Sequence, residues 1–318
     1  MIIKQIPEDF IVKEISNVKL KDEGIFSLYR MKKKEYTSER AVQKICDEFG
    51  IRRKFIGYAG NKDKKAITEQ VISIRIKRKV DLSLKDIHLE FLGFSDEPVS
   101  LGDLEGNEFI ITVRDLGRVD LAVPDKIPNY FGEQRFSENN VKIGKLILKK
   151  DFKRAVEVIR DDKEFHDLIC DYLERNKNDY IGALRLIPKK ILRLYVHSVQ
   201  SHIFNLTVRE IINKKISDIK RVPIIGFGSE IEDERVEEII DRLLSEERIT
   251  YRDFIIKEIP ELSSEGTERD VFMEVKDFKI IEKGDDELNE GKKKVRLGFK
   301  LKKGSYATVV IKQLFKGL

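Results

Sequence analysis

The alternation of apolar and polar residues predicts β-strands in the first third of the chain. Ile72, Ile74 and Ile76 are separated by single polar residues, which is the two-residue repeat of a strand with one buried face. The same repeat runs from Asn107 to Arg114, so that Asn107 and Phe109 share a face. Further strands are predicted within residues 1–34 and at residues 87–94.

The middle of the chain follows a different repeat. Between about residues 141 and 247 the apolar positions recur every three to four residues, and a long helix is predicted from Pro188 onward, with Pro188 in its first turn. Strand patterns return at residues 272–281 and 294–301. This order predicts an α+β fold, in which a sheet built from both ends of the chain is interrupted by a mostly helical insertion.

One helix near the start has clear ends. Thr37 and Ser38 can cap its N-terminus, and Gly50 suits its C-terminus. Between them Ile45 and Cys46 belong to an apolar stripe, which predicts that the helix packs on the sheet. We expect Cys46 to be a small core residue and not a reactive thiol.

The segment after this helix combines two predicted strands with a charged turn. The turn passes through Gly60 and Asn61 and carries one acid, Asp63, among three lysines. We expect Asp63 to be exposed at the tip of a hairpin and ionised, because the neighbouring lysines favour the charged carboxylate. A carboxylate on a basic rim can serve as a nucleophile that faces a polyanion. An ordinary solvated turn has the same local pattern.

Composition limits the class of protein without identifying it. The 318 residues suffice for two domains, and 62 basic against 57 acidic residues leave a net charge of only +5, which does not by itself indicate a nucleic-acid partner. Two distant cysteines, Cys46 and Cys170, predict reduced thiols and a cytosolic location. The sequence has no apolar run of membrane-spanning length, no Gly-rich nucleotide loop and no clustered metal ligands. We therefore expect no membrane, metal or cofactor partner.

Six motifs in a fixed order resemble those of the TruD family of tRNA pseudouridine synthases. The signature is Gly60-x-Lys62-Asp63-x-x-Ala66-x-Thr68-x-Gln70. The other motifs are Phe10-x-Val12-x-Glu14, Gly106-Asn107-x-Phe109, Asn129-Tyr130-Phe131-Gly132-x-Gln134-Arg135-Phe136, Ser201-x-x-Phe204-Asn205 and Gly304-Ser305-Tyr306-Ala307-Thr308. One short match is weak evidence, whereas six matches spread over most of the chain are specific.

The resemblance implies a domain division and an activity. It implies a catalytic domain of mostly antiparallel sheet at residues 1–130 and 271–318, with an inserted domain at residues 131–270. It also implies that the partner is tRNA, and that a uridine at position 13 of the D arm is isomerised to pseudouridine without a cofactor. We expect the protein to act as a monomer.

The resemblance also assigns the central residues of the site. Asp63 is the expected catalytic residue, while Asn107 and Phe109 are expected to receive the uridine base. Stacking of a base on an aromatic ring contributes about 1–3 kcal/mol. Without the resemblance, Phe109 would be interpreted as a core residue, because strand phenylalanines are usually buried.

Three further residues are candidates for substrate contacts. Glu14 is expected to orient Asp63 or the ribose, and one lysine of the run from Lys32 to Lys34, with Lys32 as the candidate, is expected to do the same or to contact a phosphate. The run has the pattern of a solvated strand end as well. Arg135 lies in an aromatic-rich block that suits both RNA binding and a domain junction.

Two other classes of function compete with the isomerase. A non-catalytic RNA-binding protein or tRNA folding chaperone could use the same residues. A metal-dependent nuclease would need at least two clustered carboxylates, whereas the charged turn offers only Asp63.

Overall fold

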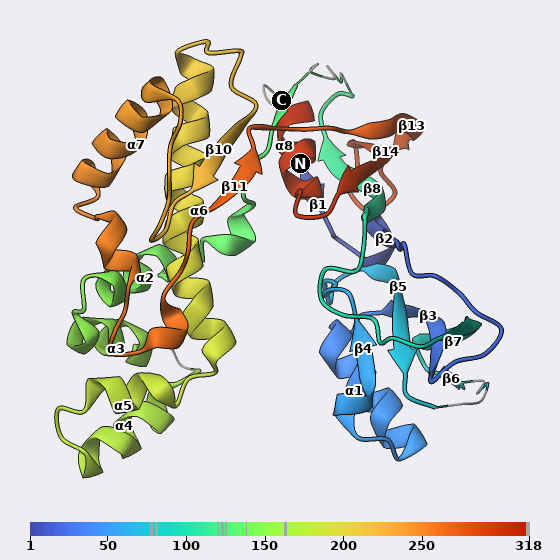
Figure 1. Cartoon of the computed structure of the whole chain (residues 1–318). Helices are drawn as coiled ribbons and strands as arrows, with labels where there is room; N and C mark the ends of the chain where they lie inside the picture. The colour runs from blue at the N-terminus through green and yellow to red at the C-terminus, as the bar shows by residue number, and fades with distance from the viewer. Residues whose placement is uncertain are drawn as a thin grey trace. The chain divides into compact units, whose positions relative to one another are not determined.

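The computed structural model of the chain forms two compact units (Figure 1). It describes residues 1–76, 79, 82–119, 121, 124, 126–137, 139–161 and 164–315, and at residues 82 and 83 only the backbone. Unit 1 is Met1–Ile127 with Met273–Leu318, and unit 2 is Pro128–Phe272. These boundaries lie within three residues of the predicted ones. The assignment of catalysis to unit 1 stays a prediction.

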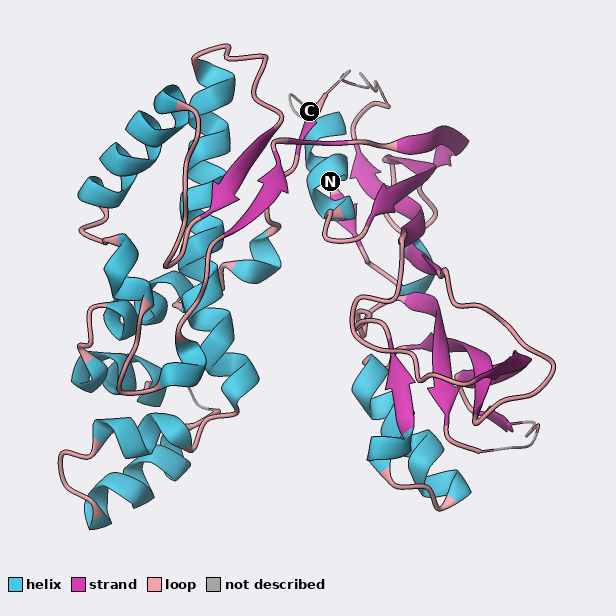
Figure 2. Cartoon of the chain, in the orientation of Figure 1, coloured by secondary structure: helices cyan, strands magenta, loops and turns pink. Residues whose placement is uncertain are grey.

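Strands dominate unit 1 and helices dominate unit 2 (Figure 2), which confirms the predicted α+β fold. The strands of unit 1 are β1 (Ile2–Ile3), β2 (Phe10–Ile15), β3 (Phe26–Lys34), β4 (Ile56–Tyr58), β5 (Ile67–Ile74), β6 (Leu82–Leu84), β7 (Ile87–Ser95), β8 (Gly106–Leu116), β13 (Lys276–Asp285) and β14 (Lys293–Lys302). Its α-helices are α1 (Ser38–Phe49) and α8 (Ala307–Leu314). β9 (Ile127–Pro128) and β12 (Phe272–Met273) lie where the chain passes between the units.

Within the described residues, these strands of unit 1 form a single ten-stranded sheet. Its order is β13-β14-β8-β2-β5-β3-β7-β6, with β1 beside β8 and β4 beside β5. The pairings are antiparallel except that of β2 with β5, which runs in parallel from Ile11 opposite Ile67 to Lys13 opposite Glu69. Since β2 and β14 flank β8, the two ends of the chain meet at that strand, as the sequence predicted.

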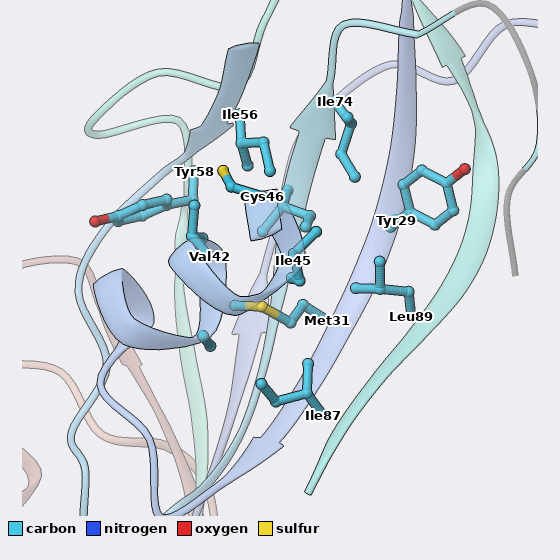
Figure 3. Close-up of a cluster of buried hydrophobic side chains, with 12 residues drawn as sticks. Tyr29, Met31, Val42, Ile45, Cys46, Ile56, Tyr58, Ile74, Ile87 and Leu89 are labelled. Atoms are coloured by element: carbon cyan, nitrogen blue, oxygen red, sulfur yellow. The ribbon is translucent and has the colours of Figure 1, made fainter. Parts of the chain in front are cut away.

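Helix α1 covers part of this sheet. Thr37 accepts a hydrogen bond from the Arg40 amide, and Gly50 ends the helix with a left-handed φ of 62°, so both predicted caps are confirmed. Cys46 is buried in the core, as predicted. Figure 3 shows the helix and the sheet closing over a cluster that includes Tyr29, Met31, Val42, Ile45, Cys46, Ile56, Tyr58, Ile74, Ile87 and Leu89.

A buried arginine ties the first turn of the chain to its last hairpin. The Arg114 guanidinium on β8 donates to Asp9 and to Asp286, each at 2.8 Å, and all three residues are almost inaccessible to solvent. Its remaining nitrogen contacts Glu287 at 3.1 Å. Buried charges of this kind persist only when each is paired.

Unit 2 is built around the predicted long helix α6 (Lys189–Asn213), in which Pro188 is the N-cap residue and the helix itself begins one residue later than expected. Its other helices are α2 (Asn140–Leu148), α3 (Phe152–Arg160), α4 (His166–Arg175), α5 (Tyr180–Arg185) and α7 (Glu234–Glu246). β10 (Arg221–Ile224) pairs with β11 (Thr267–Asp270). Short 3-10 helices occur in both units, at Pro7–Asp9, Arg53–Phe55, Glu133–Arg135, Tyr251–Phe254 and Pro260–Leu262. Among the described residues, no helix is both long and apolar enough to span a membrane.

Candidate active site

Asp63 lies in the turn between the antiparallel strands β4 and β5, which confirms the predicted strand-turn-strand. Its side chain is 38% exposed, and its carboxylate forms an ion pair with the ammonium of Lys4. The structure thus places an accessible carboxylate at the position that the motif indicated.

Lys4 is a contact that the sequence pattern did not reveal. Its ammonium is 4.0 Å from the centre of the Phe10 ring, so it contacts both an aromatic face and Asp63. Lys4 also has a φ of 61°, which is uncommon for a residue with a β-carbon. The two charges are 59 residues apart in the chain, so no local motif connects them.

Lys62, the residue before Asp63, contacts two of the predicted site residues. Its Nζ lies 2.8 Å from Oε2 of Glu14 and donates to Oδ1 of Asn107, also at 2.8 Å. The Glu14 side chain is fully buried and that of Lys62 is only 7% exposed. The expectation that all the lysines of this turn form an exposed rim is therefore wrong for Lys62. A solvent-facing lysine and a buried one look alike in sequence.

Glu14 also completes the sheet next to the turn. One edge of β5 pairs with β2 as far as Glu69 and with β4 from Ile72 onward. The amide of Val71 falls in the gap between these two ladders. Its nitrogen donates a hydrogen bond to Oε1 of Glu14 at 3.2 Å. Glu14 therefore satisfies a backbone donor that would otherwise be buried without a partner.

Two buried polar side chains fix the backbone of the turn. Ser38 accepts a hydrogen bond from the Lys62 amide at 2.9 Å and donates to Oε1 of Gln70 at 2.6 Å. The Nε2 of Gln70 donates to the carbonyl of Gly60 at 3.1 Å. Both side chains are almost fully buried. Such a satisfied network holds the turn in a single conformation.

Lys33 is the lysine of β3 that reaches the turn. It is 1% exposed, and its Nζ donates to the backbone carbonyls of Tyr36 and, at 2.9 Å, Asp63. Burial lowers the pKa of Lys33 to about 8, with the charge of Asp63 opposing and that of Lys62 adding to the effect. This lysine thus supports the backbone that presents the carboxylate.

Lys32, the lysine chosen from the sequence, points to the other face of β3. Its side chain is 56% exposed, and its Nζ lies 3.7 Å from Oε1 of Glu69. The signal that separates the two lysines is the phase of the strand, because buried Tyr29 and Met31 share a face with Lys33. A substrate contact by Lys32 stays a prediction.

Asn107 and Phe109 both lie on β8, and Asn107 is the one that accepts the hydrogen bond from Lys62. Phe109 is 7% exposed and packs edge-on against Phe10 at 6.2 Å and face-on against Phe299 at 5.6 Å. Only a small part of this ring is accessible to a ligand. A β-carbon at Gly106 would lie 2.1 Å from the carbonyl oxygen of Leu301, which explains the glycine of this motif.

Arg135 belongs to unit 2, in the short helix Glu133–Arg135. Its Nε donates to Oγ of Ser201 at 3.2 Å, and its guanidinium is 5.6 Å from the Phe131 ring centre. The Phe131 amide donates to Asn205 at 2.9 Å, so the aromatic block and the α6 motif belong to one local structure.

Among the residues that the structure describes, no cluster of three or more His, Cys, Asp or Glu could hold a metal ion.

Comparisons with known proteins agree on one family. The family model described as tRNA pseudouridine synthase D (TruD) matches residues 1–168, 164–222 and 218–314. The tRNA pseudouridine synthase D of Aquifex aeolicus is 30% identical, over 98% of this chain and 97% of its own length. A Methanocaldococcus jannaschii protein named probable tRNA pseudouridine synthase D 2 is 32% identical, over 100% and 92%. The crystal structure of a Methanosarcina mazei protein assigned as TruD superposes with a TM-score of 0.76, at 28% identity, covering 99% of this chain and 93% of the other.

Proposed function

Since the chain belongs to the TruD family of tRNA pseudouridine synthases, and is thus an isomerase that acts on tRNA, we propose that Asp63 is its catalytic residue and uridine 13 of the D arm its target. The observation that carries this proposal is the environment of the Asp63 carboxylate. It is accessible, paired with the Lys4 ammonium and mounted on a turn that buried hydrogen bonds hold in place.

The reaction needs no outside reagent. The bond between N1 of uracil and C1′ of ribose breaks, the base turns, and C5 joins C1′, while the hydrogen of C5 is lost and N1 regains one. Asp63 can act in three ways: by attack on C1′, by attack on C6 of the base, or by removal of a ribose proton. In each case the carboxylate is the reacting group, and in the structure its ion-pair partner is the Lys4 ammonium.

The neighbours of Asp63 have supporting roles in this proposal. Lys62 donates a hydrogen bond to Oδ1 of Asn107. This contact orients the Asn107 amide so that the Asn107 side-chain nitrogen can donate to a uracil carbonyl. Phe109 presents the accessible part of its ring to the same base. Glu14 holds Lys62 and β5 in place, so its contribution is to position the turn. The cytosolic location and the monomeric state stay predictions.

The test compares the wild type with Asp63→Asn on an unmodified tRNA transcript in the presence of a chelator, with pseudouridine mapped chemically. The amide matches the carboxylate in size but lacks its charge, so we expect product at position 13 only from the wild type, with similar tRNA affinity for both. Asp47→Asn, an exposed change on α1, is the matched control and should retain activity.

Three outcomes would count against the proposal. Product formed by Asp63→Asn would remove the aspartate from the chemistry. Product at another position alone would contradict the D-arm target. Tight binding of tRNA by the wild type without any product would favour a folding chaperone.

A further inference from the structure

A second candidate binding site lies entirely within unit 2. It is a pocket of about 440 Å³. Its walls come from α6, from the aromatic block before α2, and from the segment that leads into β11. The lining residues are Phe131, Arg135, Arg193, His197, Gln200, Ser201, Ile224, Glu261, Ser263, Ser264, Glu265, Thr267 and Arg269. We call this the arginine pocket.

Two arginines of the pocket are anchored by neutral oxygen atoms. Arg193 donates its Nε to the carbonyl of Glu261 at 3.0 Å, and Arg135 donates its Nε to the Ser201 hydroxyl at 3.2 Å. Among the described residues, neither has a carboxylate within salt-bridge distance. Elsewhere in the chain, arginines are commonly paired with Asp or Glu, as at residues 53, 114, 221, 235 and 242.

The third arginine of the pocket, Arg269, is held by neighbouring residues. Arg269 donates to the side-chain and backbone oxygens of Asn129, at 2.7 and 3.0 Å, and its guanidinium lies 4.3 Å from the Phe131 ring centre. Two acids, Glu261 and Glu265, also line the pocket. Glu261 is partly neutralised by Lys189, whose Nζ is 3.6 Å from it. Positive charge therefore exceeds negative charge at this site.

The pKa of His197 reflects the same excess of positive charge. Burial lowers the pKa of its imidazole, and the charges of Arg135 and Arg193 lower it further. Both guanidinium groups are thus close enough to act on the same ring, and all three side chains line the pocket. A neutral imidazole can donate one hydrogen bond and accept another without adding charge.

We propose that the arginine pocket binds a backbone phosphate of the substrate tRNA, with Arg135 and Arg193 as its ligands. This inference rests on the tRNA substrate of the family and deepens the proposed function, because it gives unit 2 its own point of attachment to the RNA. The guanidinium fork matches the geometry of phosphate oxygens better than an ammonium does. The size of the pocket falls within the range of small-ligand sites, so it can admit the phosphate with its attached sugar.

The experiment uses the full chain and an unmodified tRNA transcript. The dissociation constant is measured between about 50 and 200 mM KCl for the wild type, Arg193→Gln and Arg175→Gln. Arg193 is exposed, so its replacement should leave the fold intact, which circular dichroism verifies. Arg175 is an exposed arginine of α4 in the same unit, and it controls for the loss of one positive charge.

The expected result is a specific change in salt dependence. Loss of one phosphate contact should reduce the slope of log K against log salt by about one and weaken binding about tenfold at 0.1 M salt. Arg175→Gln should match the wild type. Turnover by Arg193→Gln should show a raised KM and an unchanged kcat, because the pocket binds RNA without touching the reacting atoms.

The proposal is overturned if Arg193→Gln keeps the wild-type slope, or if Arg175→Gln changes the slope equally. Failure here is distinguishable from failure of the proposed function. Asp63→Asn should lose product and keep the wild-type slope, whereas Arg193→Gln should lose slope and keep product.

Discussion

The buried pair of Lys62 and Glu14 gives the sharpest test of how the site is held together. Both side chains are nearly inaccessible, and besides Lys62 the Glu14 carboxylate has the Val71 amide as its partner. Lys62→Met would keep most of the volume of the side chain and remove its charge. The carboxylate of Glu14 would then be left buried, with the hydrogen bond from the Val71 amide as its remaining polar contact among the described residues.

The expected loss in the free energy of unfolding follows from this geometry. Removal of one partner of a buried ion pair costs about 3–5 kcal/mol, a large fraction of the roughly 5–15 kcal/mol that stabilises a typical domain. Adding Glu14→Gln removes the unpaired charge, and its amide oxygen can still accept from Val71. We therefore expect the double variant to recover to within about 1 kcal/mol of the wild type, because replacing both partners of such a pair is often nearly neutral.

The assay is urea unfolding at about pH 7, monitored by circular dichroism because the chain has no tryptophan. Lys64→Met, an exposed change in the same turn, should alter the free energy of unfolding by less than about 0.5 kcal/mol. The reasoning is refuted if Lys62→Met costs less than about 1 kcal/mol, or if the double variant is as unstable as Lys62→Met alone.

Two further predictions concern charge and stability. Burial alone would raise the pKa of Asp286, but hydrogen bonds from the amide of Asp115 and the Arg114 guanidinium help to hold that pKa well below its usual range. The ionised Asp286 therefore contributes to stability near neutral pH, and this contribution is lost as the pH falls below about 4. Arg114→Met should therefore lower the free energy of unfolding by about 3–5 kcal/mol and move the midpoint of acid unfolding to higher pH, and an unchanged midpoint would contradict this. The pKa of Lys33 is lowered to about 8 against 10.5 for an unperturbed lysine, so the unfolded state binds more protons between these values and stability should rise with pH there. Urea unfolding at about pH 7.5 and pH 9.5 should show this rise for the wild type relative to Lys33→Met, and equal differences at both pH values would refute it.

Much of the framework follows from local patterns. The caps of α1 at Thr37 and Gly50 and the two-residue repeat of β8 were sufficient to predict those elements, because each depends on residues close in sequence. The order of strand and helix segments likewise predicted a sheet built from both chain ends. The boundary near Ile127 could only be approximated, since short strands at a domain junction carry little periodic signal.

The side chains around Asp63 were harder to predict, because they come from distant segments. Lys4 reaches Asp63 across 59 residues, and Lys62 reaches Asn107 across 45. A run of identical lysines hides which member is buried, although the phase set by Met31 singles out Lys33. Burial of a lysine is a tertiary property, so no local pattern distinguishes the buried Lys62 from the exposed lysines of the same turn.

The meeting of both chain ends at β8 has a consequence for synthesis on the ribosome. β8 ends at Leu116, but its neighbour β14 begins only at Lys293. At the usual pace of translation, roughly ten seconds or more separate the emergence of these strands. The nascent chain must carry β8 with one exposed edge throughout that interval, while unit 2 is synthesised and can fold first. Premature termination before β14 would leave this edge open permanently, and open edges promote aggregation.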